Sequence, residues 1–278
     1  MTASEAGALQ ADIVEGTPDG RPPLVLLHGL TFDRAMWRPA LAELSRIDAG
    51  RQILAADLPG HGDSPPWPDY DIESVADAVH ATIRRTRLDP PVLVGHSLSA
   101  LVAMDYAARY PARGVVNVDA WLDIGPTIAM VKSLAGEIRG GGFAKAWQLF
   151  EDSMHIETLP ASARRLLRPV SDVRQEVVAG YWREAMDRPA PEFSARVASI
   201  IAKLRANQVS YLFVAGHPVE IDYLDWLSQR LPGAAVRVLP DSGHFPQLAH
   251  PARFAEYLAA TARWAAPARR DGAARAAR

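Results

Sequence analysis

Short apolar runs recur along the chain from residue 24 onward, and longer segments with helical spacing separate most of them. Apolar runs without polar interruption are typical of strands that are covered on both faces of a sheet. Strands that alternate with helices in this way predict an α/β fold, with a mainly parallel sheet, right-handed crossovers and helices on both faces. The predicted strands are 24–27, 53–56, 92–94, 115–118, 211–214 and 236–239, with 11–14 as a further candidate at an edge.

Two of the predicted helices have an apolar face that can be assigned residue by residue. Asp71 is a suitable N-cap for the first of them, because its side chain can accept a hydrogen bond from the backbone of the first turn. The apolar residues on one face of this helix are Ile72, Val75, Ala76, Val79 and Ile83. The helix after 211–214 has a narrower apolar stripe, which consists of Ile221, Leu224, Leu227 and Leu231.

One interval breaks the alternation of strands and helices. About ninety residues separate the strand 115–118 from the strand 211–214, which is far more than one crossover needs. This interval contains several helical patterns, and its turn-forming breaks are 140–142, Pro160 and 189–191. We therefore predict a helical cap at 121–206, inserted into an α/β core made of 1–120 and 207–266. The Ala/Arg-rich segment 267–278 has no apolar face and is predicted to be a disordered tail.

The composition excludes several classes of partner and chemistry. Lys and Arg number 30 against 32 Asp and Glu, so the net charge of −2 indicates neither a nucleic-acid partner nor binding to an acidic membrane surface. Cysteine is absent, which rules out disulfides, thiolate nucleophiles and Cys-ligated metals. We find neither the apolar stretch of a secretory signal nor a run of about 18 apolar residues, so we expect a cytoplasmic protein.

A candidate nucleophile lies between a predicted strand and the helix that follows it. The sequence at 95–99 is GHSLS, and its small residues allow a sharp turn that exposes the Ser97 hydroxyl above the sheet. The backbone amides at the start of the next helix point to the same place, where an oxyanion would form. The usual pattern of such a turn is G-x-S-x-G, and Ser99 replaces its last glycine with another small residue.

Two further segments follow strands at the same edge of the predicted sheet. His244 comes just after the last strand, and the segment 28–30 (HGL) comes just after the first one of the core. Because parallel strands bring their carboxyl ends to one edge, these segments meet Ser97 there. The backbone N–H groups of Leu30 and Leu98 are then natural donors to an oxyanion.

These segments resemble the α/β-hydrolase family. The resemblance covers roughly residues 11–265 and rests on four segments in the family's order: 28–30 (HGL), 57–64 (DLPGHGDS), 95–99 (GHSLS) and 242–245 (SGHF). It implies a nucleophile at Ser97, a general base at His244 and an oxyanion hole at Leu30 and Leu98. It implies neither a cofactor nor a metal.

The acid that completes the triad has several candidates. In much of the family it follows the penultimate strand, where this chain has Val219 at the expected spacing and Glu220 next to it. A subset of the family has its acid one strand earlier, where this chain has Asp119 and, four residues later, Asp123. A carboxylate at the end of a buried strand needs a partner, and an imidazole N–H is such a partner. We therefore favour Asp119, with Glu220 and Asp123 as alternatives.

A serine nucleophile under an apolar, Trp-containing cap predicts an acyl-transfer enzyme. The expected substrate is a small to medium, largely apolar carboxylic ester or lactone. A carbon–carbon bond hydrolase or a thioesterase is an alternative with the same residues. A small-ligand receptor on this fold is another, and the departures at Ser99 and Val219 are the features that favour it. The sequence is also compatible with a homo-oligomer.

Overall fold

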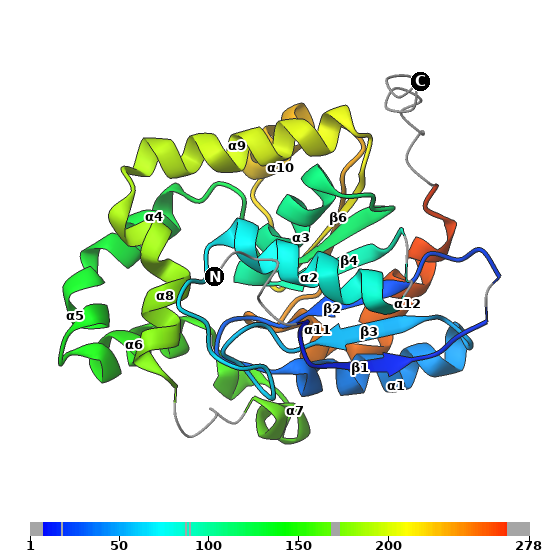
Figure 1. The fold of residues 1–278 in the computed structure, drawn as a ribbon, viewed down its shortest axis with the longest axis horizontal. Coiled ribbons are helices and arrows are strands. Elements are labelled where there is room, and N and C mark those ends of the chain that lie inside the picture. The colour runs from blue at the N-terminus through cyan, green and yellow to red at the C-terminus, as the bar shows by residue number, and fades with distance from the viewer. Residues whose placement is uncertain (1–7, 18, 87, 89, 168–172, 266–278) are drawn as a thin grey trace, which may run out of the picture.

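A twisted seven-stranded sheet organises the computed structural model, which describes residues 8–17, 19–86, 88, 90–167 and 173–265 (Figure 1). The strand order is β1-β3-β2-β4-β5-β6-β7. The edge strand β1 pairs antiparallel with β3, and the other neighbouring strands pair parallel. The bounds of the strands are β1 Ala11–Val14, β2 Leu24–Leu27, β3 Ile53–Ala56, β4 Val92–His96, β5 Gly114–Val118, β6 Ser210–Ala215 and β7 Ala235–Val238. The mainly parallel α/β sheet predicted from the sequence is confirmed.

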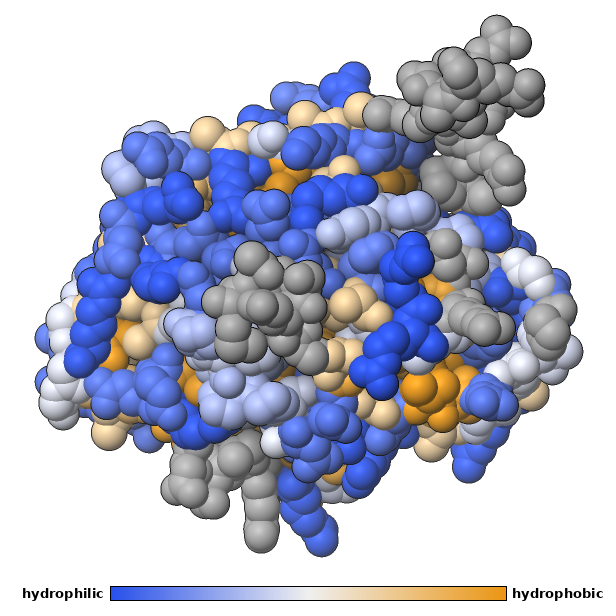
Figure 2. Space-filling model, in the orientation of Figure 1, coloured by the Kyte–Doolittle hydropathy of each residue, from blue (hydrophilic) through white to orange (hydrophobic). Residues whose placement is uncertain are grey.

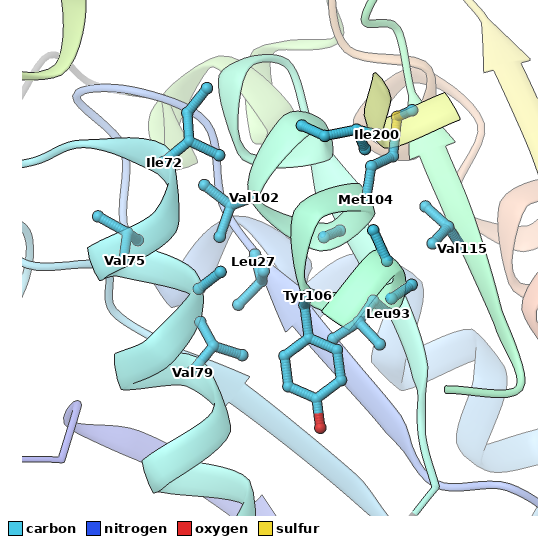
Figure 3. Close-up of a cluster of buried hydrophobic side chains, with 14 of the residues drawn as sticks. Leu27, Ile72, Val75, Val79, Leu93, Val102, Met104, Tyr106, Val115 and Ile200 are labelled. Carbon is cyan, nitrogen blue, oxygen red and sulfur yellow. The ribbon is translucent and has the colours of Figure 1, made fainter. Parts of the chain in front are cut away.

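Helices cover both faces of this sheet. The helices α1 (Arg38–Ile47) and α12 (Pro251–Ala260) pack together on one face, and α2 (Ile72–Thr86) and α3 (Leu98–Arg109) pack together on the other. Neighbouring residues of a strand enter opposite cores: Leu26 packs with the first pair of helices and Leu27 with the second, as the period of two requires. Figure 3 shows Leu27 between Val102 and Val79, and Leu93 beside Tyr106, in the core of the α2–α3 face.

The sequence predicts details of two helices, and the structure confirms one prediction and corrects the other. At α2, Asp71 Oδ1 accepts a hydrogen bond from the backbone N–H of Ser74 at 2.9 Å, which confirms the predicted N-cap. At α10 (Ile221–Arg230) the buried residues are Tyr223 and Leu227, and Ile221 is 66% exposed, so the predicted stripe is wrong at its first member. Ile221 lies two positions before Tyr223, about 200° around the helix axis, and therefore points away from the sheet.

Besides the short 3₁₀ helix η2 (Ile156–Thr158), six α-helices occupy the described part of the chain between β5 and β6. They are α4 Gly125–Ser133, α5 Ala135–Arg139, α6 Phe143–Ser153, α7 Ala161–Leu166, α8 Gln175–Asp187 and α9 Ala190–Ala206. In Figure 1, α4, α5, α6 and α8 gather beside the sheet, where they share a small apolar cluster around Phe150 and Ile138. The long helix α9 instead packs along α3 and α10, and its buried residues belong to the core of the α2–α3 face. The boundaries of cap and core remain a prediction, and the predicted tail 267–278 lies outside the described residues.

The surface is mainly polar on the face drawn in Figure 2, where apolar residues form small groups. The exposed large apolar side chains include Ile13 and Val14 on the edge strand β1. Within the described ranges, we find no helix with the length and apolar character needed to cross a membrane.

Candidate active site

The carboxyl ends of the parallel strands bring the predicted site residues to one cavity. This cavity has a volume of about 350 Å³. The residues of its wall that the sequence singled out are Leu30, Ser97, Leu98, Asp119 and His244. They follow β2, β4, β5 and β7, which lie side by side with β6 in the sheet. Segments that are far apart in the chain thus meet where open α/β sheets hold their sites.

Ser97 forms the sharp turn between β4 and α3. It is the single residue between them, with φ 56° and ψ −129°, a conformation that non-glycine residues rarely adopt. Its backbone N–H donates to the carbonyl of Val118 at 2.9 Å, which ties the turn to the end of β5. A Cβ at Gly95 would lie 2.5 Å from the backbone oxygen of Ser99, so only glycine fits there. Strain of this kind is typical of functional turns.

Ser99 fits the position where the usual pattern has glycine. Its side chain is fully buried, and its hydroxyl lies 2.7 Å from the carbonyl oxygen of Leu27 and 2.9 Å from that of His96. The hydroxyl therefore finds acceptors on β2 and within the turn, and it ties the two together. This departure from the pattern leaves the turn intact.

His244 is paired with Asp119. Its Nδ1 donates to Asp119 Oδ2 at 2.8 Å, and Asp119 Oδ1 accepts from the backbone N–H of Gly216 at 2.8 Å. Since a carboxylate only accepts, the ring proton of neutral His244 belongs on Nδ1, and Nε2 is left with a lone pair. His244 is thereby held in the tautomer that a general base needs.

Asp119 is 5% exposed and has the unusual φ of 54°. Burial raises the pKa of Asp119, but the hydrogen bond and charge of His244, together with the Gly216 N–H, outweigh it. The pKa of Asp119 consequently lies below its ordinary value. The group remains a carboxylate at neutral pH, which balances the charge of a protonated imidazole.

The other two acid candidates lie elsewhere. Glu220 and Asp123 are exposed, and neither lines the cavity. Glu220 precedes α10, where its backbone oxygen accepts from the N–H of Tyr223. Among the described residues, Asp119 is the acid that lies within hydrogen-bonding distance of His244.

The amides of Leu30 and Leu98 are available as donors at the cavity wall. Neither has a hydrogen-bond acceptor among the residues that the structure describes. Leu98 is the first residue of α3, a 12-residue helix whose N-terminal dipole favours negative charge there. The two amides can therefore hold an oxyanion without first breaking a bond within the protein.

Two buried histidines support these loops. His28 Nε2 accepts from the Leu58 N–H at 2.9 Å, and its Nδ1 donates to the Gly29 oxygen at 2.7 Å, which anchors the loop that carries Leu30. His96 Nε2 donates to the backbone oxygen of His244 at 2.7 Å. The Nδ1 of His96 has no partner within the described ranges, and it faces Gly29, where a Cβ would lie only 2.5 Å away.

His61 is buried like His28 and His96, and we expect the three histidines to make the stability of the fold sensitive to acid. Burial lowers the pKa of His28 to about 4 and the pKa values of His61 and His96 to about 3, from an ordinary value of about 6.5. Between about pH 6.5 and pH 4 the unfolded chain therefore binds more protons than the folded chain, and the free energy of unfolding falls as the pH falls. We expect a slope of up to about 1.4 kcal/mol per pH unit for each histidine. Urea unfolding at several pH values measures it, and equal stability at pH 6.5 and pH 5 would contradict it.

Most of the cavity wall is apolar and aromatic. Its rings include Phe150 and Trp182, whose centroids lie 4.3 Å apart, and Trp147 beside them. Helices α6 and α8 supply these three residues. The described residues contain no group of three or more His, Asp or Glu side chains that could hold a metal.

Sequence patterns did not reveal two backbone groups that hold Asp119 and His244 in place. The Gly216 N–H binds Asp119, and the Met154 oxygen accepts from the His244 N–H at 3.1 Å. A weak signal exists at Gly243, which has φ 52° and where a Cβ would lie 2.6 Å from that same Met154 oxygen. Glycine allows the chain to approach so closely.

Comparison with known proteins identifies the family of this chain. The profile of the Alpha/beta hydrolase family matches residues 24–257. The chain belongs to this family. It is similar to the pimeloyl-[acyl-carrier protein] methyl ester esterase of Neisseria meningitidis serogroup A, with 28% identity over 251 residues that cover 86% of this chain and 76% of the esterase.

A further relative matches a shorter stretch of this chain. RutD of Escherichia coli O127:H6, a candidate carbamate hydrolase, is 32% identical over 143 residues, and the match covers 50% of each chain. The chain thus spans about half the length of the first curated relatives that it matches. Among solved structures, AqdC, which recognises the Pseudomonas quinolone signal and cleaves its ring, has a TM-score of 0.74 at 19% identity, over 92% of this chain and 97% of AqdC. This likeness shows the fold.

Proposed function

We propose that this protein is a serine hydrolase that cleaves a small to medium, largely apolar carboxylic ester or lactone through an acyl-enzyme. One observation carries the proposal: Ser97 on its strained turn, the Asp119-bound His244 and the amides of Leu30 and Leu98 share one cavity wall. Nucleophile, base, acid and oxyanion donors are the parts that acyl transfer needs.

In the first half of the reaction, His244 Nε2 takes the proton of the Ser97 hydroxyl as its oxygen bonds to the carbonyl carbon of the substrate. The carbonyl electrons move onto oxygen, and the N–H groups of Leu30 and Leu98 donate to this oxyanion. When the intermediate collapses, the bond to the alkoxy group breaks and His244 returns the proton to it. An ester loses an alcohol here, whereas a lactone keeps its new hydroxyl on the acyl chain.

In the second half, a water molecule gives a proton to His244 Nε2 and bonds to the acyl carbon. The same two amides hold the second oxyanion, and the bond to Ser97 then breaks. His244 returns the proton to the serine, so the enzyme is restored and a carboxylic acid leaves. Throughout, Asp119 keeps the ring in the required tautomer and stabilises its charged form.

The substrate class follows from the cavity wall and from the relatives. A volume of about 350 Å³ lies at the small end of ligand pockets, and the aromatic side chains favour an apolar acyl or alkoxy group. A methyl ester esterase and a candidate carbamate hydrolase are among the relatives, and both substrate types present a carbonyl carbon with an oxygen-linked group. These names support the reaction type and leave the acyl group open.

A panel of esters and lactones of graded size tests the proposal. We expect turnover that is highest for apolar substrates that fit about 350 Å³ and that falls when a charged group is added to either side of the carbonyl. The release of acid, followed with a pH indicator, measures it. A protein that is stabilised against heat by such molecules yet hydrolyses none of them is a receptor, and the proposal would then be wrong.

A further inference from the structure

The loop that carries Leu30 depends on side chains for its shape. It joins β2 to the short helix η1 (Arg34–Trp37), and Thr31 within it has φ 70°, a left-handed conformation that is unfavourable for a β-branched residue. The backbone N–H of Thr31 donates to His61 Nε2 at 3.0 Å. This bond fixes the peptide next to the Leu30 amide, so His61 acts at the edge of the proposed oxyanion hole.

His61 is itself fixed in one tautomer. Its Nδ1 lies 3.0 Å from the backbone oxygen of Pro59, which can only accept, and therefore carries the ring proton. Its Nε2 is then an acceptor, as the Thr31 N–H requires. Burial lowers the pKa of His61 to about 3, so the ring is neutral and keeps this acceptor at neutral pH.

The cap helix α8 docks on the same turn. Tyr181 donates its hydroxyl to the Pro59 oxygen at 3.0 Å, and Arg174 just before the helix donates to the Gly60 oxygen. Val177 lies so close that a Cβ at Gly60 would be 3.1 Å from its side chain. Positions 174, 177 and 181 are three and four residues apart, so they share one face of the helix.

Helix α8 also forms a wall of the cavity. Tyr181 is among its lining residues, together with Trp182 and Ala185. A substrate in the cavity therefore touches the same helix that binds the Pro59 oxygen. The contacts run without a gap from the cavity through Tyr181, Pro59 and His61 to Thr31 and the amide of Leu30.

We propose that His61 and Tyr181 are positioning residues for the oxyanion hole. His61 sets the direction of the Leu30 amide through Thr31, and Tyr181 ties this support to the cap helix α8. The inference rests on the proposed function and deepens it. It links the contact between the substrate and helix α8 to the alignment of the Leu30 N–H.

Four substitutions separate positioning from packing. His61→Asn places an amide N–H near the position of Nδ1, so it keeps the bond to Pro59 and removes the acceptor for Thr31. His61→Gln places its oxygen near the position of Nε2 and restores that acceptor. Tyr181→Phe removes only the hydroxyl. Tyr70→Phe is the matched control, because the Tyr70 ring packs 4.7 Å from Tyr181, while its hydroxyl accepts from the Trp67 N–H and lies outside the cavity lining.

We expect kcat to fall about 100-fold in His61→Asn, as for the loss of one oxyanion donor, and less than about 10-fold in His61→Gln. Tyr181→Phe should lower kcat about 5-fold, since one neutral hydrogen bond is lost, and Tyr70→Phe should leave it unchanged. The KM should change less than about threefold, because the donor acts on the transition state. The affinity for a trifluoromethyl ketone, whose serine adduct bears an oxyanion, should fall in proportion to kcat.

Hydrogen–deuterium exchange of the peptides that cover residues 28–37 tests, without any turnover, whether His61 and Tyr181 hold the loop that carries Leu30. We expect faster exchange in His61→Asn and Tyr181→Phe than in the wild-type protein and Tyr70→Phe. Unchanged exchange in the first two, or equal losses of kcat in His61→Asn and His61→Gln, would overturn the inference. If exchange is faster in these two variants but the wild-type protein hydrolyses no ester or lactone, the positioning role is upheld and the proposed hydrolase is rejected.

Discussion

Replacing Ser97 with Ala is expected to lower ester or lactone turnover about 10³-fold or more, while the protein stays folded. The substitution removes the hydroxyl oxygen that bonds to the carbonyl carbon in the first half of the proposed mechanism. The amides of Leu30 and Leu98 remain, so a small residual rate above that in water should persist. Steady-state kinetics on the best substrate, with the melting temperature as a check of folding, measure the effect.

Ser99 provides the matched control for this loss. It lies two residues away, but its hydroxyl is buried against the carbonyl oxygens of Leu27 and His96 and faces no substrate. Ser99→Ala should therefore cost stability by about 1 kcal/mol and leave kcat within a few-fold of the wild-type value. Wild-type turnover in Ser97→Ala would reject the nucleophile.

Replacing Asp119 with Asn is expected to lower kcat by on the order of 10³–10⁴-fold. The carboxylate accepts the Nδ1 proton of His244 and a second hydrogen bond from Gly216. An Asn that keeps the Gly216 bond through its oxygen turns its NH₂ group toward His244. The ring then accepts at Nδ1 and carries its proton on Nε2, where it cannot take the proton of Ser97.

The other two acid candidates serve as controls for Asp119. Glu220 and Asp123 are exposed and line no part of the cavity, so Glu220→Gln and Asp123→Asn should change kcat less than about threefold. Kinetics of all three variants on one substrate rank them. A larger loss in Glu220→Gln than in Asp119→Asn would move the acid to the loop after β6.

The strands were predictable because buried strands appear in the sequence as short runs of apolar residues. The runs at 24–27 and 53–56 match β2 and β3 residue for residue, since both faces of these strands are covered and every position is apolar. The stripe on α10 failed at Ile221 because an apolar residue in the first turn of a helix can still point outward. Helical spacing alone does not determine which side of such a short pattern faces the sheet.

The candidate site was predictable to a different degree at each residue. Ser97 and His244 stand out because they follow strands and have glycine or serine within two positions, which reflects the turns they occupy. The sequence favoured Asp119 but left two alternatives, because its partner His244 is 125 residues away. Tyr181 reaches Pro59 across 122 residues, and no local pattern predicts a contact of that kind.

Labelling with a fluorophosphonate, followed by peptide mapping, tests the central claim most directly. A serine reacts with this probe only when a neighbouring base and oxyanion donors activate its hydroxyl. We predict one phosphonate per chain, carried by Ser97, with labelling abolished in Ser97→Ala and strongly slowed in His244→Ala. An unlabelled wild-type protein, or a label on another serine, would contradict it.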